Sequence, residues 1–379
     1  MQYRTFGKLD WQPSALGFGA MRLPILNDDA GQIDAPLATQ MIRHAIDQGV
    51  NYVDTAWPYH KGASEPFLAE ALAAGYRERV KLATKMPSWL IESAADFDKY
   101  LDQQLERLQT GMIDFYLLHA LHKKSWEKLR DLGVREWAER AIADGRIGHL
   151  GFSFHDEFAV FKQIVDEYDG FAFCQIQYNY MDVDYQAGVK GLRYAAERGL
   201  AVVIMEPLRG GRLAKNPPPP PVVALWAQAP IQRTPADWAL QWLWNQPEVS
   251  LLLSGMSTMQ HVEENLASAA RSGIGSLTSP ELALVEQVRV AYQSLIPIPC
   301  TACEYCLPCP QGVAIPRIFT TYNEGIMYED VAGARNSYNN WMDAKERADL
   351  CVQCRQCEEQ CPQHIEIVEW LQKAHALLG

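Results

Sequence analysis

The 379-residue sequence has no apolar stretch approaching the roughly 20 residues that a transmembrane helix needs. Its first residues, MQYRTFGKLDWQP, also lack the apolar core and the small-residue cleavage site of a secretory signal. These absences exclude a membrane-spanning protein and predict a cytoplasmic one. A sizeable core is available, because 48% of the residues are hydrophobic and only 21% are charged.

Positive charge is also scarce. The sequence has 34 basic against 46 acidic residues, which gives a net charge of −12 at pH 7. Polyanionic partners select basic surfaces, so nucleic acid and anionic membranes are disfavoured. Small molecules and basic patches on other proteins are the partners that this charge favours.

Cysteine is nearly absent from the first 299 residues, where only Cys174 occurs, in an apolar run typical of a core strand. The other eight of the nine cysteines lie in two short runs near the end of the sequence. In a reducing compartment, clustered cysteines are more often metal ligands than disulfides. The two runs are therefore candidate metal sites.

Between residues 15 and 270, short apolar runs alternate with longer amphipathic segments, a pattern typical of repeated βα units and a parallel sheet. The expected strands are residues 16–21, 50–54, 80–85, 113–119, 147–153, 171–177, 201–206 and 249–255. Eight units predict an α/β fold, a closed (β/α)8 TIM barrel. A doubly wound open sheet is the alternative, but GFGAM lacks the third glycine and the following helix of a dinucleotide-binding turn. The proline run 217–221 is interpreted as a stiff surface connection, with part of a lid as the alternative.

Polar residues stand at the carboxyl ends of the expected strands, where (β/α)8 barrels carry their active sites. Asp54, Lys85, His119, Ser153 and Gln175 each follow an apolar run. Each alone has a simpler explanation, such as a turn-forming aspartate or a satisfied core histidine. Their joint occurrence favours a functional site.

Tyr59, five residues after Asp54, suits this set as a proton donor. A tyrosine hydroxyl has an unperturbed pKa of about 10, and a neighbouring cation such as Lys85 would lower it. Asp54 would pair with Lys85, while His119 would donate a hydrogen bond to a substrate oxygen. The set fits carbonyl reduction, with Tyr59 protonating the developing alkoxide as general acid.

The segment NYVDTAWPYHKGASE resembles the aldo/keto reductase signature of an Asp, a Tyr five residues on, and a downstream Gly-x-Ser-Glu. LATKMP and DFYLLHA resemble that family's lysine and histidine segments, and the resemblance extends over about residues 1–290. It implies a catalytic tetrad of Asp54, Tyr59, Lys85 and His119, a small carbonyl or alcohol substrate, and NAD or NADP across the barrel mouth. Met205 departs from the pattern, since it stands where many members have a tyrosine that stacks on the nicotinamide.

The resemblance also implies where the nicotinamide cofactor would bind. Ser153 and Gln175 would hold the carboxamide, residues 207–213 the pyrophosphate, and residues 255–265 the adenosine end. The residues implied are Ser153, Gln175, Pro207, Leu208, Gly210, Gly211, Leu213, Gly255 and Asn265. Gly255 and His261 stand where strongly NADP-selective members carry Lys and Arg, and Arg209, Arg212 and Arg271 are candidate replacements. The choice between NAD and NADP stays open.

The two cysteine runs have the spacing of iron–sulfur ligands. The first contains Cys300, Cys303, Cys306 and Cys309, and the second contains Cys351, Cys354, Cys357 and Cys361. The second run, which ends in proline, has bacterial ferredoxin spacing, in which the fourth cysteine serves the other of two [4Fe–4S] clusters. We therefore expect Cys361 to join the first three cysteines of the first run, and Cys309 to join those of the second. Zinc sites and disulfides are the alternatives.

The change in composition near Ile296 predicts two domains, a barrel over residues 1–296 and a small α-helical ferredoxin-like domain over residues 297–379. This combination resembles a bacterial and archaeal group of aldo/keto reductase-like oxidoreductases with a C-terminal ferredoxin domain. A hydride carries two electrons and a cluster accepts one, so a flavin is a further candidate cofactor. The leading hypothesis is a carbonyl–alcohol oxidoreductase. The alternatives are an electron-transfer oxidoreductase with a ferredoxin or flavoprotein partner, and a redox- or iron-sensing module that binds nicotinamide.

Overall fold

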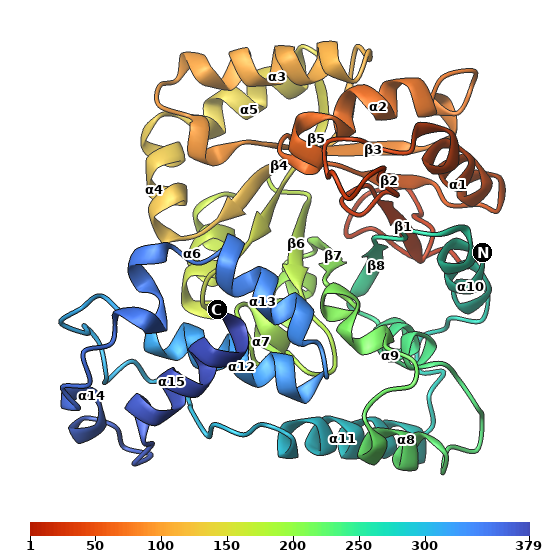
Figure 1. The fold of residues 1–379 in the computed structure, drawn as a ribbon. Coiled ribbons are helices and arrows are strands. Elements are labelled where there is room, and N and C mark those ends of the chain that lie inside the picture. The colour runs from red at the N-terminus through yellow and green to blue at the C-terminus, as the bar shows by residue number, and fades with distance from the viewer. The chain divides into compact units, whose positions relative to one another are not determined.

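The computed structural model describes residues 1–379 and contains a closed barrel of eight parallel strands in sequential order (Figure 1). The strands are β1 (Leu16–Gly19), β2 (Tyr52–Asp54), β3 (Lys81–Met86), β4 (Ile113–Leu121), β5 (Ile147–Phe154), β6 (Phe173–Gln177), β7 (Ala201–Met205) and β8 (Val249–Ser254). Each expected strand is present, and β1 pairs with β8 to close the ring. The predicted (β/α)8 barrel is confirmed.

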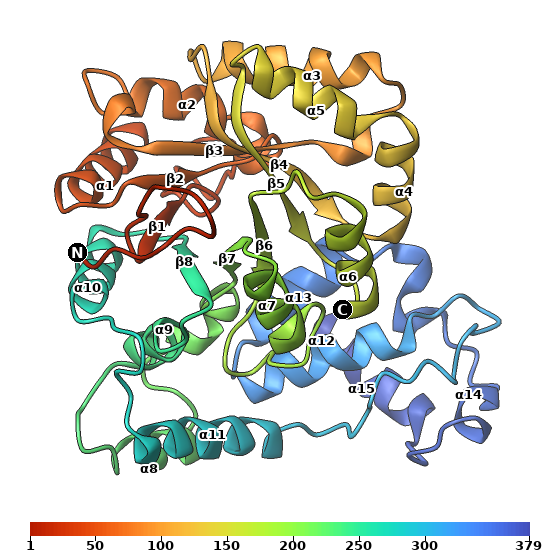
Figure 2. The ribbon, with the colours of Figure 1, turned by 180° about the vertical axis from the view of Figure 1, so that it is seen from behind.

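Helices surround the strands on the outside of the ring, as Figures 1 and 2 show. They are α1 (Ala35–Asp47), α2 (Ser64–Ala71), α3 (Ala95–Arg107), α4 (Lys123–Asp131), α5 (Val134–Ala143), α6 (Phe158–Glu167), α7 (Gly188–Glu197), α9 (Pro235–Trp244) and α10 (Met259–Ala270). α1 illustrates why they form. The Asp34 side chain caps its first turn by accepting from Leu37 N, and Met41, Ile42 and Ala45 face the core at helical spacing.

The inside of the barrel is filled by side chains. Tyr52, Phe115, Phe173 and Leu251 pack together there, and Phe6 from the N-terminal segment joins them. A filled interior means that a ligand binds at a mouth of the barrel and not through its centre. Cys174 faces the surrounding helices and is fully buried, as expected for a core residue.

The chain divides into two compact units. The first comprises Met1–Gly210 and Ala236–Thr278, and the second comprises Gly211–Pro235 and Ser279–Gly379. The second unit contains α8 (Pro220–Trp226), α11 (Ser279–Ser294), α12 (Ile315–Met327), α13 (Val331–Asn340), α14 (Gln356–Glu359) and α15 (Ile367–Leu378). α8 and α11 contact each other although the chain separates them by the whole of α9, β8 and α10. The domain boundary after residue 296 stays a prediction.

The proline run 217–221 is only partly the surface connection that was predicted. Pro220 and Pro221 are the first residues of α8, directly after Pro219. Proline suits this position because its fixed φ is helical and its missing N–H would have no partner in a first turn. The interpretation as a surface connection is therefore wrong for Pro220 and Pro221, which are helical, and for Pro218 and Pro219, which are buried.

The second unit has its own apolar core, formed mainly by α12, α13 and α15. Ile318, Phe319, Tyr338 and Leu371 are fully buried in it. Six cysteines pack against this core, namely Cys300, Cys306, Cys309, Cys351, Cys357 and Cys361. None of the helices in the structure is both long and apolar enough to cross a membrane.

Candidate functional site

Three of the predicted site residues meet around one buried ammonium group. Lys85 Nζ, on β3, donates to Asp54 Oδ1 at 2.6 Å and to Thr55 O at 2.7 Å. It also lies 3.3 Å from the Tyr59 hydroxyl. The side chains of Lys85 and Asp54 are only 1% and 2% exposed. The structure thus forms a desolvated ion pair directly beside a tyrosine hydroxyl.

Local backbone geometry brings Tyr59 to this position. Asp54 ends β2, and Tyr59 begins a short 3₁₀ turn, Tyr59–Gly62. The next residues, His60 and Lys61, both have φ of 53°, which is left-handed. The His60 ring holds the turn in place, because Nε2 accepts from Leu23 N at 3.2 Å while Nδ1 lies 2.8 Å from Ala30 O.

His119, on β4, completes the predicted tetrad. Its ring lies edge-on to that of Tyr59, with centroids 6.3 Å apart, and 5.2 Å from the ring of Trp89. His119 Nδ1 is buried and has no hydrogen-bond partner. Because buried polar atoms are normally paired, this nitrogen is an available partner for a ligand.

Burial and charge determine the protonation of the tetrad. Burial raises the pKa of Asp54 and of Tyr59, and the nearby Lys85 charge only partly opposes both shifts. Burial alone would lower the pKa of Lys85, but Asp54 and Tyr59 raise it above its usual value. Burial and the Lys85 charge hold the pKa of His119 well below its usual range. Near neutral pH, Lys85 is charged, Tyr59 is protonated and His119 is neutral. The net lowering of the Tyr59 pKa expected from the sequence does not occur, because burial outweighs the effect of Lys85.

The residues expected to bind the nicotinamide ring lie on adjacent strands. Ser153 on β5 is the register partner of Gln175 on β6. Ser153 Oγ accepts from Ala120 N at 2.7 Å, and Ala120 directly follows His119. Gln175 Nε2 lies 3.7 Å from Met205 Sδ, while Gln175 Oε1 is buried without a partner. A carboxamide N–H would satisfy this oxygen, so Gln175 fits a nicotinamide.

The other residues expected at the cofactor are dispersed along the chain. Pro207, Leu208 and Gly210 belong to the first unit, whereas Gly211 and Leu213 belong to the second. Gly210 and Gly211 have left-handed φ values of 67° and 95°. Asn265 Nδ2, on α10, donates to Ser254 Oγ at 3.0 Å. A Cβ at Gly255 would lie 3.1 Å from the side chain of Arg22, so no larger residue fits there without moving it.

The three arginines considered for a 2′-phosphate are all paired with carboxylates. Arg209 lies 3.4 Å from Asp182, Arg271 lies 3.1 Å from Asp237, and Arg212 lies 2.7 Å from Glu324. A 2′-phosphate would have to compete with these carboxylates for the guanidinium groups. The structure therefore adds no clear preference for NADP over NAD.

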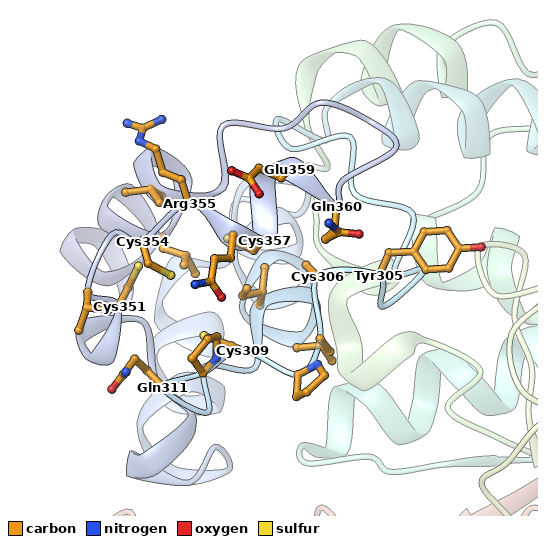
Figure 3. Close-up of a pocket in the computed structure, with 18 residues that line it drawn as sticks. Tyr305, Cys306, Cys309, Gln311, Cys351, Cys354, Arg355, Cys357, Glu359 and Gln360 are labelled. Carbon is orange, nitrogen blue, oxygen red and sulfur yellow. The ribbon is translucent and has the colours of Figure 1, made fainter.

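The eight clustered cysteines line two pockets in the second unit. One pocket is lined by Cys306, Cys309, Cys351, Cys354 and Cys357 (Figure 3). The other is lined by Cys300, Cys303, Cys306 and Cys361. Apart from Cys306, which borders both, each cysteine lines the pocket of the cluster to which its spacing assigned it. Cysteines from both runs line each pocket, an arrangement that fits the sharing of ligands between two clusters.

The pockets differ in volume and in the environment of their thiols. The first measures about 350 Å³ and the second about 20 Å³. Burial raises the pKa of Cys306 and of Cys357 to about 11. Neighbouring thiols raise both pKa values further. At Cys306 these are the thiols of Cys300, Cys303 and Cys361. At Cys357 they are the thiols of Cys351 and Cys309. Bound metal would have to displace these protons.

Comparison with known proteins identifies the barrel. Residues 15–283 match the model of the aldo/keto reductase family. The chain belongs to the aldo/keto reductase family. Residues 299–366 match the model of a 4Fe-4S dicluster domain, and this range contains all eight clustered cysteines. The aldo/keto reductase barrel is thus followed by a 4Fe-4S dicluster domain, as predicted. Neither family description names a flavin, so the flavin has no support.

Individual relatives agree with this assignment. The chain is 25% identical over 311 residues to L-galactose dehydrogenase of Arabidopsis thaliana, covering 76% of this chain and 94% of the relative. It is 27% identical over 268 residues to methylglyoxal reductase YeaE of Escherichia coli (strain K12), covering 69% and 87%. Among solved structures, aldo-keto reductase AKR11C1 from Bacillus halodurans (holo form) matches with a TM-score of 0.63 and 26% identity, over 76% of this chain and 96% of that one.

Trp89 lies beside the predicted tetrad, and the sequence did not point to it. It lies in a short 3₁₀ turn, Ser88–Leu90, after β3, and it is 48% exposed beside His119. Its place four residues after Lys85 was the available signal, because loops after barrel strands form the active-site mouth.

Proposed function

We propose that this aldo/keto reductase family oxidoreductase interconverts a carbonyl and an alcohol at the barrel mouth with a nicotinamide cofactor. The observation that carries the proposal is the buried ammonium of Lys85, which lies between Asp54 Oδ1 at 2.6 Å and the Tyr59 hydroxyl at 3.3 Å. A desolvated cation beside a tyrosine hydroxyl has a clear chemical use, since it stabilises the phenolate that remains after proton transfer.

Each residue of the tetrad has a separate role in the transfer of one proton. When bound, the nicotinamide would supply the hydride that the carbonyl carbon accepts. Tyr59, protonated near neutral pH, gives its proton to the carbonyl oxygen, and Lys85 stabilises the resulting phenolate. Asp54 keeps the ammonium in place, and neutral His119 donates a hydrogen bond that orients the substrate oxygen. In the direction of alcohol oxidation, the Tyr59 phenolate takes the proton back.

The nicotinamide contacts form a second part of the proposal. Gln175 Oε1, buried and unpaired, would accept from the carboxamide, and Ser153 Oγ would donate to it. Residues 207–213 would contact the pyrophosphate, and Gly255 and Asn265 the adenosine end. These assignments come from the family resemblance.

We also propose a distribution of ligands between two [4Fe–4S] clusters. Cys300, Cys303, Cys306 and Cys361 would hold one, and Cys309, Cys351, Cys354 and Cys357 the other. The support is that each set lines a common pocket. Thiolates are the ligands of such clusters, which fits the donor set.

The presence of a dicluster domain favours a second candidate function, an electron-transfer oxidoreductase that uses a ferredoxin or flavoprotein partner. The test is to add NADH or NADPH to anaerobic protein without substrate and to follow the visible absorbance. Bleaching of the iron–sulfur bands would support electron transfer from nicotinamide to the clusters. Unchanged bands would leave carbonyl reduction as the function to pursue.

The primary proposal is tested by Tyr59→Phe. Methylglyoxal with NADH or NADPH, and L-galactose with NAD or NADP, serve as first probes, since relatives act on substrates of these names. General acid catalysis contributes about 10²–10⁴-fold, and we expect a loss in kcat of this size with unchanged nicotinamide binding. Tyr178→Phe is the matched control, because it removes a barrel hydroxyl that only contacts Gln246 Oε1 at 3.2 Å. Full activity of Tyr59→Phe would contradict the proposal.

A further inference from the structure

The Gly-x-Ser-Glu stretch after Tyr59 ends in a glutamate that proton transfer does not use. Glu65, on α2, is completely buried. Its Oε1 accepts from Thr84 Oγ1 at 2.6 Å and from Gln104 Nε2 at 2.5 Å, and its Oε2 lies 3.2 Å from Arg107 Nε. A buried carboxylate is tolerated only with partners of this kind. Glu65 therefore joins β3 and α3 to the segment that follows Tyr59.

Arg107, the last residue of α3, links this carboxylate to the turn that carries Tyr59. Its guanidinium lies over the Trp57 ring, 4.2 Å from the centroid. Its Nη2 donates to Gly62 O and lies 3.5 Å from Trp57 O. Trp57 and Gly62 flank Tyr59 on its two sides, so one side chain contacts both ends of the turn.

The turn needs such support because its backbone is unfavourable. His60, Lys61 and Gly62 are consecutive residues with φ of 53°, 53° and 90°. L-residues rarely adopt left-handed φ, and such conformations persist only where the surroundings hold them. The His60 ring, bound to Leu23 N, fixes one side of the turn, and Arg107 fixes the other.

The same buried cluster contacts the other tetrad strands. Gln104 Nε2 donates to Lys85 O at 3.1 Å, and Gln104 Oε1 accepts from the Tyr116 hydroxyl at 2.6 Å. Tyr116 precedes His119 by three residues on the same strand, β4. The strands that carry Lys85 and His119 and the segment that follows Tyr59 are therefore connected through the buried side chains of Glu65 and Gln104.

We propose that Arg107, oriented by Glu65, is a positioning residue that keeps the Tyr59 hydroxyl within reach of Lys85. The inference rests on the proposed role of Tyr59. Arg107 contacts the main chain and the Trp57 ring of the turn, not the tetrad side chains, so it acts only through the turn. A guanidinium suits this position because its Nε faces the Glu65 carboxylate while its Nη2 donates to Gly62 O, a spread of contacts that a compact lysine ammonium does not match.

The test uses Arg107→Ala in the full-length protein with its clusters. We expect kcat with methylglyoxal to fall about 100-fold at nearly unchanged KM, since small misplacements of catalytic groups have costs of this order. Added methylguanidinium should restore part of kcat in Arg107→Ala and none in Tyr59→Phe. In the double variant Arg107→Ala/Tyr59→Phe, the two fold-losses in kcat should not multiply, because Arg107 acts through Tyr59.

Arg43→Ala is the matched control. Arg43 donates to Ala71 O at 3.0 Å, at the far end of α2, and lies 4.8 Å over the Tyr76 ring. It thus makes the same kinds of contact without touching the Tyr59 turn, and its removal should leave kcat unchanged. Arg107→Lys keeps the positive charge but loses the planar guanidinium, and it should show an intermediate kcat. It replaces Arg107→Ala in the test if that variant does not fold.

Several results would overturn the inference. One is an unchanged kcat in both Arg107 variants. Another is an equal loss of kcat in Arg107→Ala and Arg43→Ala. The third is that the losses of kcat multiply in Arg107→Ala/Tyr59→Phe. If the wild-type protein reduces no carbonyl, the proposed function fails separately, and amide hydrogen exchange decides the positioning role. Arg107→Ala should then accelerate exchange at Tyr59 and Ala63 while Arg43→Ala does not. Unchanged exchange at these amides would refute the role.

Discussion

Replacement of Lys85 by methionine tests whether the buried ion pair serves catalysis or stability. At 2.6 Å and an effective dielectric constant of about 20, the Lys85–Asp54 pair attracts by about 6 kcal/mol. Desolvation of both ions offsets much of this attraction, and removal of one partner from a buried pair typically costs about 3–5 kcal/mol. Lys85→Met also leaves Asp54 with neither oxygen paired to a side chain, since Oδ2 already has no partner. We expect a loss of about 3–5 kcal/mol in unfolding free energy, together with the loss of turnover.

The double variant Lys85→Met/Asp54→Asn separates the two effects. Because it removes both charges, most of the stability should return, to within about 1 kcal/mol of the wild-type protein. Turnover should stay lost, since no cation remains beside Tyr59. Urea unfolding under anaerobic conditions, followed by tryptophan fluorescence, measures the stability, and nicotinamide oxidation measures the turnover. The reasoning is refuted if Lys85→Met is as stable as the wild-type protein or if the double variant regains activity.

Three further predictions concern protonation and ligands. Burial holds the pKa of His119 well below that of an unfolded histidine, about 6.5, so below this pH the unfolded state binds more protons. Unfolding free energy should therefore fall by up to about 1.4 kcal/mol per pH unit on acidification, and less steeply in His119→Asn; parallel pH profiles of the two would contradict this. Cys361→Ser should halve the iron content while the barrel keeps its activity, as metal analysis and anaerobic assays would show; loss of both clusters would contradict separate ligand sets. Gln175→Leu should raise KM for the nicotinamide more than it lowers kcat, and an unchanged KM would remove Gln175 from the cofactor site.

The barrel could be predicted because each strand is a short apolar run followed by a helix of regular period. The observed carboxyl ends of the strands agree closely with the expected ones, as at Asp54 in β2 and Gln177 in β6. The polar residues at these ends could be predicted as neighbours, since parallel strands bring their carboxyl ends to one mouth. Lys85, Asp54 and Tyr59 do meet there.

Other features depend on contacts that no local pattern encodes. Arg107 reaches Gly62 from a helix more than forty residues away, and its sequence context is that of an ordinary helix end. The left-handed conformation of two consecutive L-residues, His60 and Lys61, depends on tertiary contacts, because such conformations persist only where the surroundings hold them. The net rise of the Tyr59 pKa could likewise not be predicted from the sequence, since it depends on how deeply the hydroxyl is buried.

The division of the second unit between two chain segments has a consequence for the order of biosynthesis. Residues Gly211–Pro235 are translated before β8, whereas α11, the helix that α8 contacts, is translated after the last barrel strand. When β8 has just left the ribosome, the nascent chain therefore contains every strand of the barrel. Its α8 still lacks α11, the helix that it contacts in the finished protein. Val222 and Trp226 of α8 are buried in the finished protein, and we expect the absence of α11 to increase their exposure. Shortened genes that stop after the barrel would make this exposure permanent, and we expect their products to aggregate.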